Sequence, residues 1–213
     1  MSSAITGQYG WESAEAPHSC AYINPAIRRL VRQAGARDVL DAGCGNGPLC
    51  AELADDGVHI IGVDGDRRGI EIARAHYPHI RFEVATFEES PLAIGATPDG
   101  RFDCVVSTEV VEHLYAPHEF ARFCYEALRP QGTLIVSTPY HGYLKNLALS
   151  VTNMWDHHHT PLWYGGHIKF WSAKTLGALL RGAGFEIVGF EGVGRLPYLW
   201  KSMILIARKP PQP

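Results

Sequence analysis

The stretch Val39–Cys50 (VLDAGCGNGPLC) joins a short apolar run to a helical pattern through three glycines, Gly43, Gly45 and Gly47. Because glycine has no Cβ, such a loop can turn sharply and lie close against a ligand. Asp64 follows Gly47 by seventeen residues and ends the run VHIIGVD. A carboxylate at the end of that strand can accept hydrogen bonds from both ribose hydroxyls of a nucleoside cofactor. These residues together predict a nucleoside site.

The spacing of the glycines excludes two common phosphate-binding loops. No Lys-Ser/Thr pair follows them, which a P-loop requires, and G-x-G-x-G differs from the G-x-G-x-x-G pattern of dinucleotide sites. Asp41, just before the loop, would repel a pyrophosphate, but it suits a cofactor that carries a cationic amine. An ordinary strand-to-helix turn is the alternative explanation.

Short β-branched runs alternate with helical patterns along the chain, which is typical of βαβ units. Strands are expected at 38–42, 58–64, 80–84, 102–107, 133–137, 185–190 and 202–207, and helices at 48–55, 67–76, 110–114 running on through 119–128, and 173–183. The expected fold is α/β, a Rossmann-like doubly wound seven-stranded sheet that is mostly parallel and has an antiparallel edge strand. We expect an N-terminal cap over 1–36 and the main domain over 37–213. An insertion over 140–171, after the fifth strand, is expected to cover the active site.

Composition limits which partners and which cellular location we expect. The 213 residues carry a net charge of −3, which leaves no broad basic surface for a nucleic-acid backbone. The five cysteines are scattered without metal-binding spacing, and free thiols in a reducing compartment are expected. The first residues lack a signal-peptide pattern, and no apolar run approaches the roughly 20 residues of a spanning helix. We therefore expect a cytoplasmic location.

In the DAGCGNG loop and the acid that ends the second strand, the chain resembles the class I S-adenosylmethionine-dependent methyltransferases over about residues 39–209. That family places a further acid near the adenine after the third strand, and this chain has no clean match for it. Thr86 and Phe87 stand in that region instead. The resemblance implies that the cofactor is S-adenosyl-L-methionine and that it is bound by Asp41, Gly43, Gly45, Gly47, Asp64, Thr86 and Phe87.

The sequence STEVVEHLYAP follows the fourth strand. If a helix begins near Thr108, Glu109, Glu112 and His113 converge on one side of it, because they are spaced by three and four residues. Ligands bind at the carboxyl ends of strands in open α/β sheets, and two carboxylates with an imidazole there would satisfy a divalent cation. The alternative is a plain helix start, in which Thr108 caps the helix and the acids complement its dipole.

Glu-x-x-Glu-His is also similar to a narrower part of that family. The O-methyltransferases of ubiquinone biosynthesis and the 2′-O-methyltransferases of small-RNA 3′ ends bind a divalent metal at these positions, and the acceptor hydroxyl approaches it. The resemblance implies that Mg²⁺ or another divalent cation is held by Glu109, Glu112, His113 and His167, with His167 as a fourth ligand or a base.

The insertion carries more histidines and one amphipathic stretch. His141 and His157–His159 lie within it, and His113, His167 or His141 is expected to act as a general base. For 157–159 a solvated loop is the favoured explanation, and a base or ligand role is the alternative. The stripe Leu144, Leu147, Val151 and Trp155 can pack on the domain, act as a lid, or make peripheral membrane contact through 143–155. Near the start of the chain, Tyr9 and Trp11 can cap the cofactor or simply pack.

The first hypothesis is S-adenosylmethionine-dependent O-methylation of a small hydroxylated metabolite, assisted by a divalent cation. A metal-free N- or O-methyltransferase with a histidine base is the alternative, and an RNA 2′-O-methyltransferase is disfavoured by the net charge. A non-enzymatic cofactor-binding scaffold is the rival from another class. The expected partner is a small-molecule acceptor and no nucleic acid, and the oligomeric state stays open.

Overall fold

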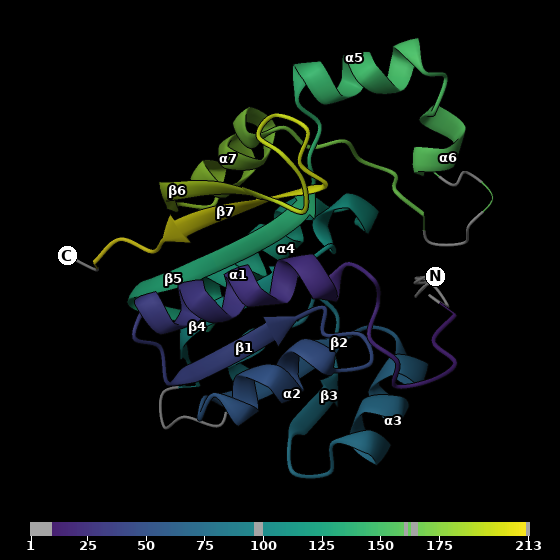
Figure 1. Ribbon diagram of the computed structural model, residues 1–213. Coiled ribbons are helices and arrows are strands. Elements are labelled where there is room, and N and C mark those ends of the chain that lie inside the picture. Colours follow the sequence, from purple (N-terminus) through teal and green to yellow (C-terminus); the bar gives the residue numbers. More distant parts are fainter. Residues whose placement is uncertain (1–9, 96–99, 160–161, 163–165, 212–213) are drawn as a thin grey trace, which may run out of the picture.

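The computed structural model describes residues 10–95, 100–159, 162 and 166–211 (Figure 1). A seven-stranded sheet in the order β3-β2-β1-β4-β5-β7-β6 forms its centre. Neighbours from β3 to β5 pair in parallel, whereas β7 is antiparallel to both β5 and β6. This confirms the expected Rossmann-like α/β fold. The strands are β1 (Asp38–Ala42), β2 (His59–Asp64), β3 (Arg81–Val84), β4 (Phe102–Thr108), β5 (Leu128–Pro139), β6 (Glu186–Val193) and β7 (Ser202–Arg208).

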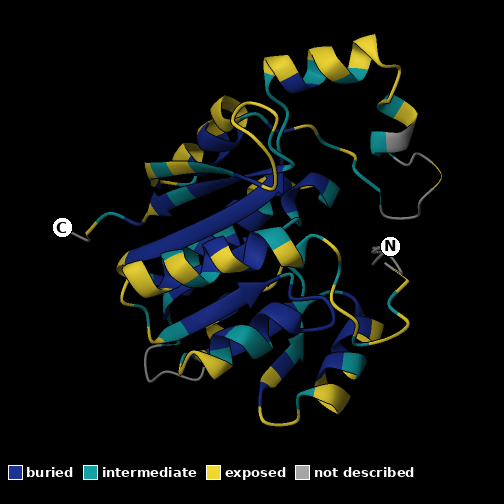
Figure 2. Ribbon diagram, in the orientation of Figure 1, coloured by how far each residue is buried: buried dark blue, intermediate teal, exposed yellow. Residues whose placement is uncertain are grey.

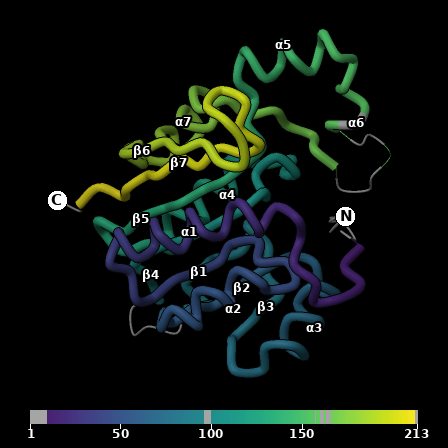
Figure 3. Tube along the Cα trace, in the orientation of Figure 1, coloured from purple at the N-terminus to yellow at the C-terminus, as the bar shows by residue number. Residues whose placement is uncertain are grey.

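Helices cover both faces of the sheet (Figures 1 and 3). Adjacent residues of β1 point to opposite faces, so Val39 belongs to the hydrophobic core under α1, α2 and α3, and Leu40 to the core under α4 and α7. The elements are α1 (Cys20–Gln33), α2 (Pro48–Asp55), α3 (Arg67–His76), α4 (Pro117–Ala127), α5 (Tyr143–Val151), α6 (Trp155–His159), α7 (Ala173–Gly182) and the 3₁₀ turns η1 (Pro91–Ala93) and η2 (Val111–His113).

Helix α1 was not predicted from the sequence. Its buried residues Ile23, Ile27 and Val31 are four apart and pack in the core beneath α2. Arg28 Nη2 lies 2.6 Å from Asp56 Oδ1 just beyond α2, and this ion pair fixes the two helices side by side. Pro25 lies inside α1 and lacks the N–H that a helix interior uses, so it weakens the helical pattern in the sequence.

The prediction of one helix that runs on from near Thr108 is wrong. The chain forms only the 3₁₀ turn η2, becomes extended at Leu114, and starts a separate helix at Pro117. A proline disfavours the helical conformation in the residue before it, and its fixed φ suits the first position of a helix. Pro117 therefore separates η2 from α4.

The apolar stripe of the insertion does not pack on the described part of the domain, so that interpretation is wrong. Helix α5 ends at Val151, and the exposed fractions of Leu144, Leu147 and Val151 are 49%, 46% and 77%. The buried residue of α5 is Lys145. Figure 2 shows α5 as a mostly exposed helix that stands off the sheet. No helix of the described residues has the length and apolar character needed to cross a membrane.

We predict that Leu40→Ala lowers the free energy of unfolding by about 2–5 kcal/mol, because Leu40 is fully buried between β2 and β4 and its removal leaves a cavity. Urea unfolding followed by circular dichroism measures the change. Val188→Ala, at a position 56% exposed on the edge strand β6, is the matched control and should change it by less than about 0.5 kcal/mol. Equal losses in both variants would contradict this account of the core.

Candidate functional site

The glycine loop follows β1 and leads into α2. Gly45 and Gly47 have φ values of +54° and +89°, which favour glycine. A Cβ on Gly45 would lie 2.6 Å from Trp11 Cζ2, and one on Gly47 would lie 2.9 Å from Phe82 Cζ. Any side chain at either position would therefore strain the backbone and displace a packed ring.

Asp64, at the end of β2, is fixed against this loop. Its Oδ2 accepts the N–H of Gly45 at 2.8 Å, and its Oδ1 accepts the N–H of Asp66 at 2.7 Å. Burial raises the pKa of Asp64, while these backbone N–H groups act in the opposite direction. Each carboxylate oxygen can accept more than one hydrogen bond, so Asp64 can still receive the hydroxyls of a ribose.

Asp41 lies at the end of β1 with 1% of its surface exposed. Its Oδ2 accepts the thiol of Cys50 at 3.3 Å, but its Oδ1 has no hydrogen-bond partner among the described residues. Burial raises the pKa of Asp41 to about 7, and the charge of Asp64 adds to that rise. A buried carboxylate oxygen without a donor is unfavourable until a ligand supplies one, and a cationic amine would do so.

One cavity of about 920 Å³ runs from the glycine loop to the turn after β4. Six of the seven residues expected to bind the cofactor line it, with Gly47 as the exception, and so do three of the four expected metal ligands. The lining residues among these are Asp41, Gly43, Gly45, Asp64, Thr86, Phe87, Glu109, His113 and His167. Thr86 and Phe87 thus border the region where an adenine would lie, and their contact with it stays a prediction.

The N-terminal segment closes one side of the cavity. Trp11 packs against Gly45 and Gly69, since a Cβ on Gly69 would lie 2.9 Å from Trp11 Cδ1. Asn46 Nδ2 donates to the backbone oxygens of Ser13 and Glu15, both at 2.9 Å, and so ties this segment to the loop. Sequence reasoning gave no role to Asn46, although its place between two loop glycines was a signal. Tyr9, the other expected cap, lies outside the described residues.

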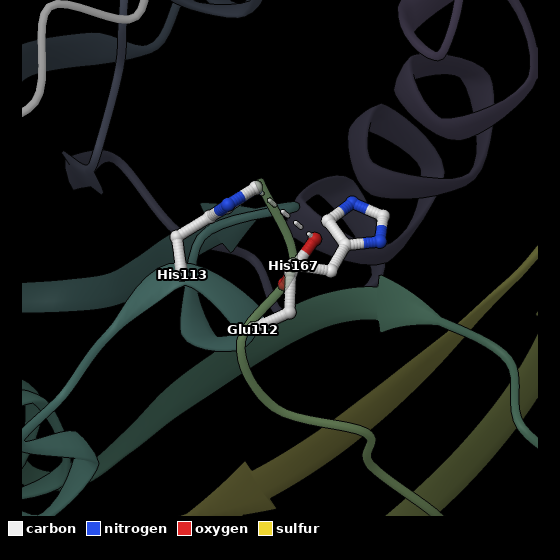
Figure 4. A group of neighbouring side chains, drawn as sticks. All are labelled: Glu112, His113 and His167. Carbon is white, nitrogen blue, oxygen red and sulfur yellow. Dashed lines mark ion pairs between the residues drawn. The ribbon is translucent and has the colours of Figure 1, made fainter. Parts of the chain in front are cut away.

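Glu112, His113 and His167 come together beside the cavity, with one ligand atom from each within 4.8 Å of the others (Figure 4). Glu112 Oε2 accepts the hydroxyl of Thr138 at 3.0 Å, while Oε1 lies 3.8 Å from His113 Nε2. Glu112 Oε1 and His167 Nδ1 are buried and have no hydrogen-bond partner among the described residues. The group therefore offers a carboxylate oxygen and imidazole nitrogens to a cation.

Backbone hydrogen bonds bring His167 to this place from the far end of the insertion. The N–H groups of Ile168 and Lys169 both donate to the carbonyl of Glu112 at 3.0 Å, and Trp171 Nε1 donates to the carbonyl of Val111 at 3.2 Å. Burial lowers the pKa of His167 to about 4, so its ring is neutral near pH 7. Burial also raises the pKa of Glu112, and the neighbouring charge of Glu109 raises it further.

Glu109 is not part of that three-residue group. Its φ of +55° turns the carboxylate toward the neighbouring strands, where Oε1 accepts the hydroxyl of Ser137 at 2.8 Å and Oε2 that of Ser202 at 3.0 Å. Burial raises the pKa of Glu109 to about 7. His141, which was expected to act as a base, is not among the described residues that line the cavity. Its ring packs against those of His158 and His159.

Sequence comparison gives two informative relatives. A protein of Mycolicibacterium smegmatis named "Probable S-adenosylmethionine-dependent methyltransferase" is 35% identical over 166 residues, which are 78% of this chain and 58% of that protein. A ubiquinone biosynthesis O-methyltransferase of Cereibacter sphaeroides is 32% identical over 171 residues, which are 80% of this chain and 68% of that enzyme. The chain thus spans less than two thirds of the mycobacterial relative.

Structure and family comparisons agree with this result. Magnesium protoporphyrin IX methyltransferase of Synechocystis shares the fold with a TM-score of 0.66 at 17% identity, over 88% of this chain and 82% of that one. The family model described as a methyltransferase domain matches residues 11–189, which include the glycine loop, Asp64 and all three residues of the group in Figure 4. The chain therefore belongs to the class I S-adenosylmethionine-dependent methyltransferase family.

Proposed function

We propose that this chain transfers the methyl group of S-adenosylmethionine to a hydroxyl oxygen of a small acceptor, assisted by a divalent cation. The observation that carries the proposal is the single cavity that joins Asp41, Asp64 and the glycine loop to His113 and His167. A donor on the loop and an acceptor beside the histidines would share one enclosed space. Such an arrangement favours a direct in-line displacement.

The residues at the loop fit this cofactor. Asp41 Oδ1, buried and unpartnered among the described residues, suits the cationic amine of the methionyl part, and Asp64 suits the ribose hydroxyls. Trp11 packs on the loop at Gly45. When bound, S-adenosylmethionine supplies an electrophilic methyl group on a sulfonium. The work left to the protein is alignment of the acceptor and removal of its proton.

Glu112, His113 and His167 offer one carboxylate and two imidazoles to a divalent cation, and two of these ligand atoms are buried without another partner among the described residues. When bound, the cation supplies a Lewis acid that lowers the pKa of an acceptor hydroxyl. The side chains of this group would hold the cation, and Thr138 orients Glu112 through its hydroxyl. The net charge of −3 supports a small acceptor over RNA.

Metal-free N- or O-methylation with a histidine base is the second candidate, and one observation favours it. His167 Nδ1 is buried with no hydrogen-bond partner in the part of the chain that the structure describes. A neutral imidazole beside the cavity can accept the acceptor's proton without a cation.

We predict that Asp64→Asn weakens the binding of S-adenosylhomocysteine by about 10- to 100-fold, because charge-assisted hydrogen bonds to the ribose are replaced by weaker ones. Isothermal titration calorimetry measures the dissociation constant. Glu71→Gln, on the exposed face of α3, should leave that constant unchanged. An unaltered affinity in Asp64→Asn would rule out the ribose role.

We predict that the affinity for S-adenosylmethionine falls as the pH drops below about 7, by up to about tenfold per pH unit. The amine binds the ionised carboxylate of Asp41, whose pKa in the free protein is about 7, so protonation below that pH competes with binding. Calorimetry from pH 5.5 to 8.5 tests this. Asp41→Asn should bind weakly with a flat profile over this range, and an equal slope in both proteins would assign the titration to another group.

We predict that excess EDTA abolishes S-adenosylhomocysteine formation with catechol or 3,4-dihydroxybenzoate as acceptor and that Mg²⁺ or Mn²⁺ restores it. Glu112→Gln should lose at least about 100-fold of the metal-stimulated rate, because a ligand and its charge are removed. Glu126→Gln, on the exposed face of α4, is the control. Full activity in EDTA, combined with a collapse in His167→Ala, would instead favour the histidine base.

A further inference from the structure

Four side chains of the insertion form a second polar group, which we call the histidine–lysine cluster: His141, Lys145, His158 and His159. The ring of His141 lies 5.4 Å from that of His158 and 5.9 Å from that of His159, between centroids. The rings of His158 and His159 are 5.0 Å apart. Neither the methyl donor site nor the group in Figure 4 includes any of these residues.

Lys145 makes this cluster unusual, because an amphipathic helix normally buries its leucines and exposes its lysine. Here Lys145 is 8% exposed, while Leu144 and Leu147 on the same helix are 49% and 46% exposed. Its Nζ donates to the carbonyl of Lys201 at 3.1 Å, which leaves ammonium protons for another acceptor. Burial lowers the pKa of Lys145 to about 8, so the side chain is still mostly charged at pH 7.

The carboxylate that acts on this lysine, that of Glu109, is shared with two serine hydroxyls. The charge of Glu109 raises the pKa of Lys145, but both oxygens of Glu109 accept serine hydroxyls. His158 Nε2 and His159 Nδ1 are buried and have no hydrogen-bond partner among the described residues. The cluster thus holds a buried ammonium and imidazole groups that can donate hydrogen bonds. These groups can still bind a hydrogen-bond acceptor.

The cluster lies next to the acceptor end of the cavity. His167 lines the cavity, and Phe170, three residues further along the chain, packs with its ring 5.2 Å from that of His141. Two aromatic rings flank the cluster: Phe170 lies 4.5 Å from the ring of His159, and Trp155 stacks on it at 5.0 Å. A planar group extending from the cavity would therefore meet aromatic walls and a positive charge.

A second metal site is a weaker explanation of the cluster. Among the described residues, Glu112, His113 and His167 are the one group that brings three ligand atoms within 4.8 Å of one another. His141, His158 and His159 are not part of such a group. The ammonium of Lys145 would also repel a cation.

We propose that the histidine–lysine cluster binds an anionic group of the acceptor, a carboxylate or a phosphate, while the acceptor's hydroxyl lies at Glu112, His113 and His167. The inference rests on the proposed function and specifies its substrate class as hydroxylated acids. Lys145 supplies the charge, and His158 and His159 supply hydrogen bonds. The same cluster would disfavour uncharged hydroxylated compounds, because they leave Lys145 without its acceptor.

Equilibrium binding separates this inference from the proposed function, since no turnover is needed. Calorimetry with the whole chain and saturating S-adenosylhomocysteine compares 3,4-dihydroxybenzoate and 3,4-dihydroxyphenylphosphonate with catechol, which lacks the anionic group. We expect the better of the two anionic probes to bind at least about tenfold more tightly than catechol, as a charge-assisted hydrogen bond to a buried lysine would give. Whichever anion binds better identifies the source as carboxylate or phosphate.

Substitutions then assign the preference to the cluster. Lys145→Met, which keeps the shape of the chain but removes the charge, should abolish the preference for the anionic probe and leave catechol unchanged. Lys145→Arg should retain most of it. Lys174→Met, exposed at the start of α7, is the matched control and should behave as wild type. If Lys145→Met does not fold, His159→Phe replaces it in the test, because phenylalanine keeps the ring contacts of His159. We expect His159→Phe to lower the affinity for the anionic probe several-fold.

Three results would overturn the inference: equal affinity of wild type for the charged and uncharged probes, no binding of any probe, or an equal loss for both kinds of probe in Lys145→Met or His159→Phe. Failure of the proposed function has a different signature. There, no probe would yield S-adenosylhomocysteine in the presence of S-adenosylmethionine, even where the anionic probe binds tightly through Lys145.

Discussion

The hydrogen bond from the Gly45 N–H to Asp64 Oδ2, at 2.8 Å, is the contact on which the cofactor site depends. It is possible because β1 and β2 are parallel neighbours that end at the same edge of the sheet. The bond holds the glycine-rich loop against the carboxylate of Asp64. Trp11 then packs on that loop, and Asn46 holds the N-terminal segment over it. One pair of strand ends thus positions most of the donor site.

The acceptor half of the cavity depends on a different kind of contact. The turn η2 follows β4, and the carbonyl of Glu112 accepts two backbone N–H groups from residues 168 and 169. These bonds bring the end of the insertion back to the sheet and place His167 beside His113. The glycine-loop half of the cavity is therefore built by neighbouring strands, whereas the half proposed for the acceptor needs a segment more than fifty residues away in the chain.

The insertion is held on the domain by apolar burial at its ends, where Tyr140 and Trp171 pack on the core, and by polar contacts of α5. Lys145 is the buried residue of α5, whereas Leu144 and Leu147 are exposed and Leu149 is half-buried. Burying an ammonium group costs free energy unless the group meets a hydrogen-bond acceptor or an opposite charge. The position of Lys145 near Glu109 and the neutral histidines is therefore evidence for a binding role. The apolar side chains of Leu144, Leu147 and Val151 in α5 stay 46–77% exposed.

The sequence by itself determined the sheet and the donor loop: β1, α2 and α3 have the predicted bounds, and Asp41 and Asp64 lie where strand ends would place them. Such features are local, because strand periodicity and the freedom of glycine act over a few residues. The tertiary structure alone decided that α1 completes a helical layer, that Glu109 turns to Ser137 and Ser202, and that α5 buries its lysine. These outcomes depend on partners that are distant in the chain. The pattern of apolar residues cannot predict that a charged side chain is buried, because the groups that stabilise its charge come together only in the folded protein.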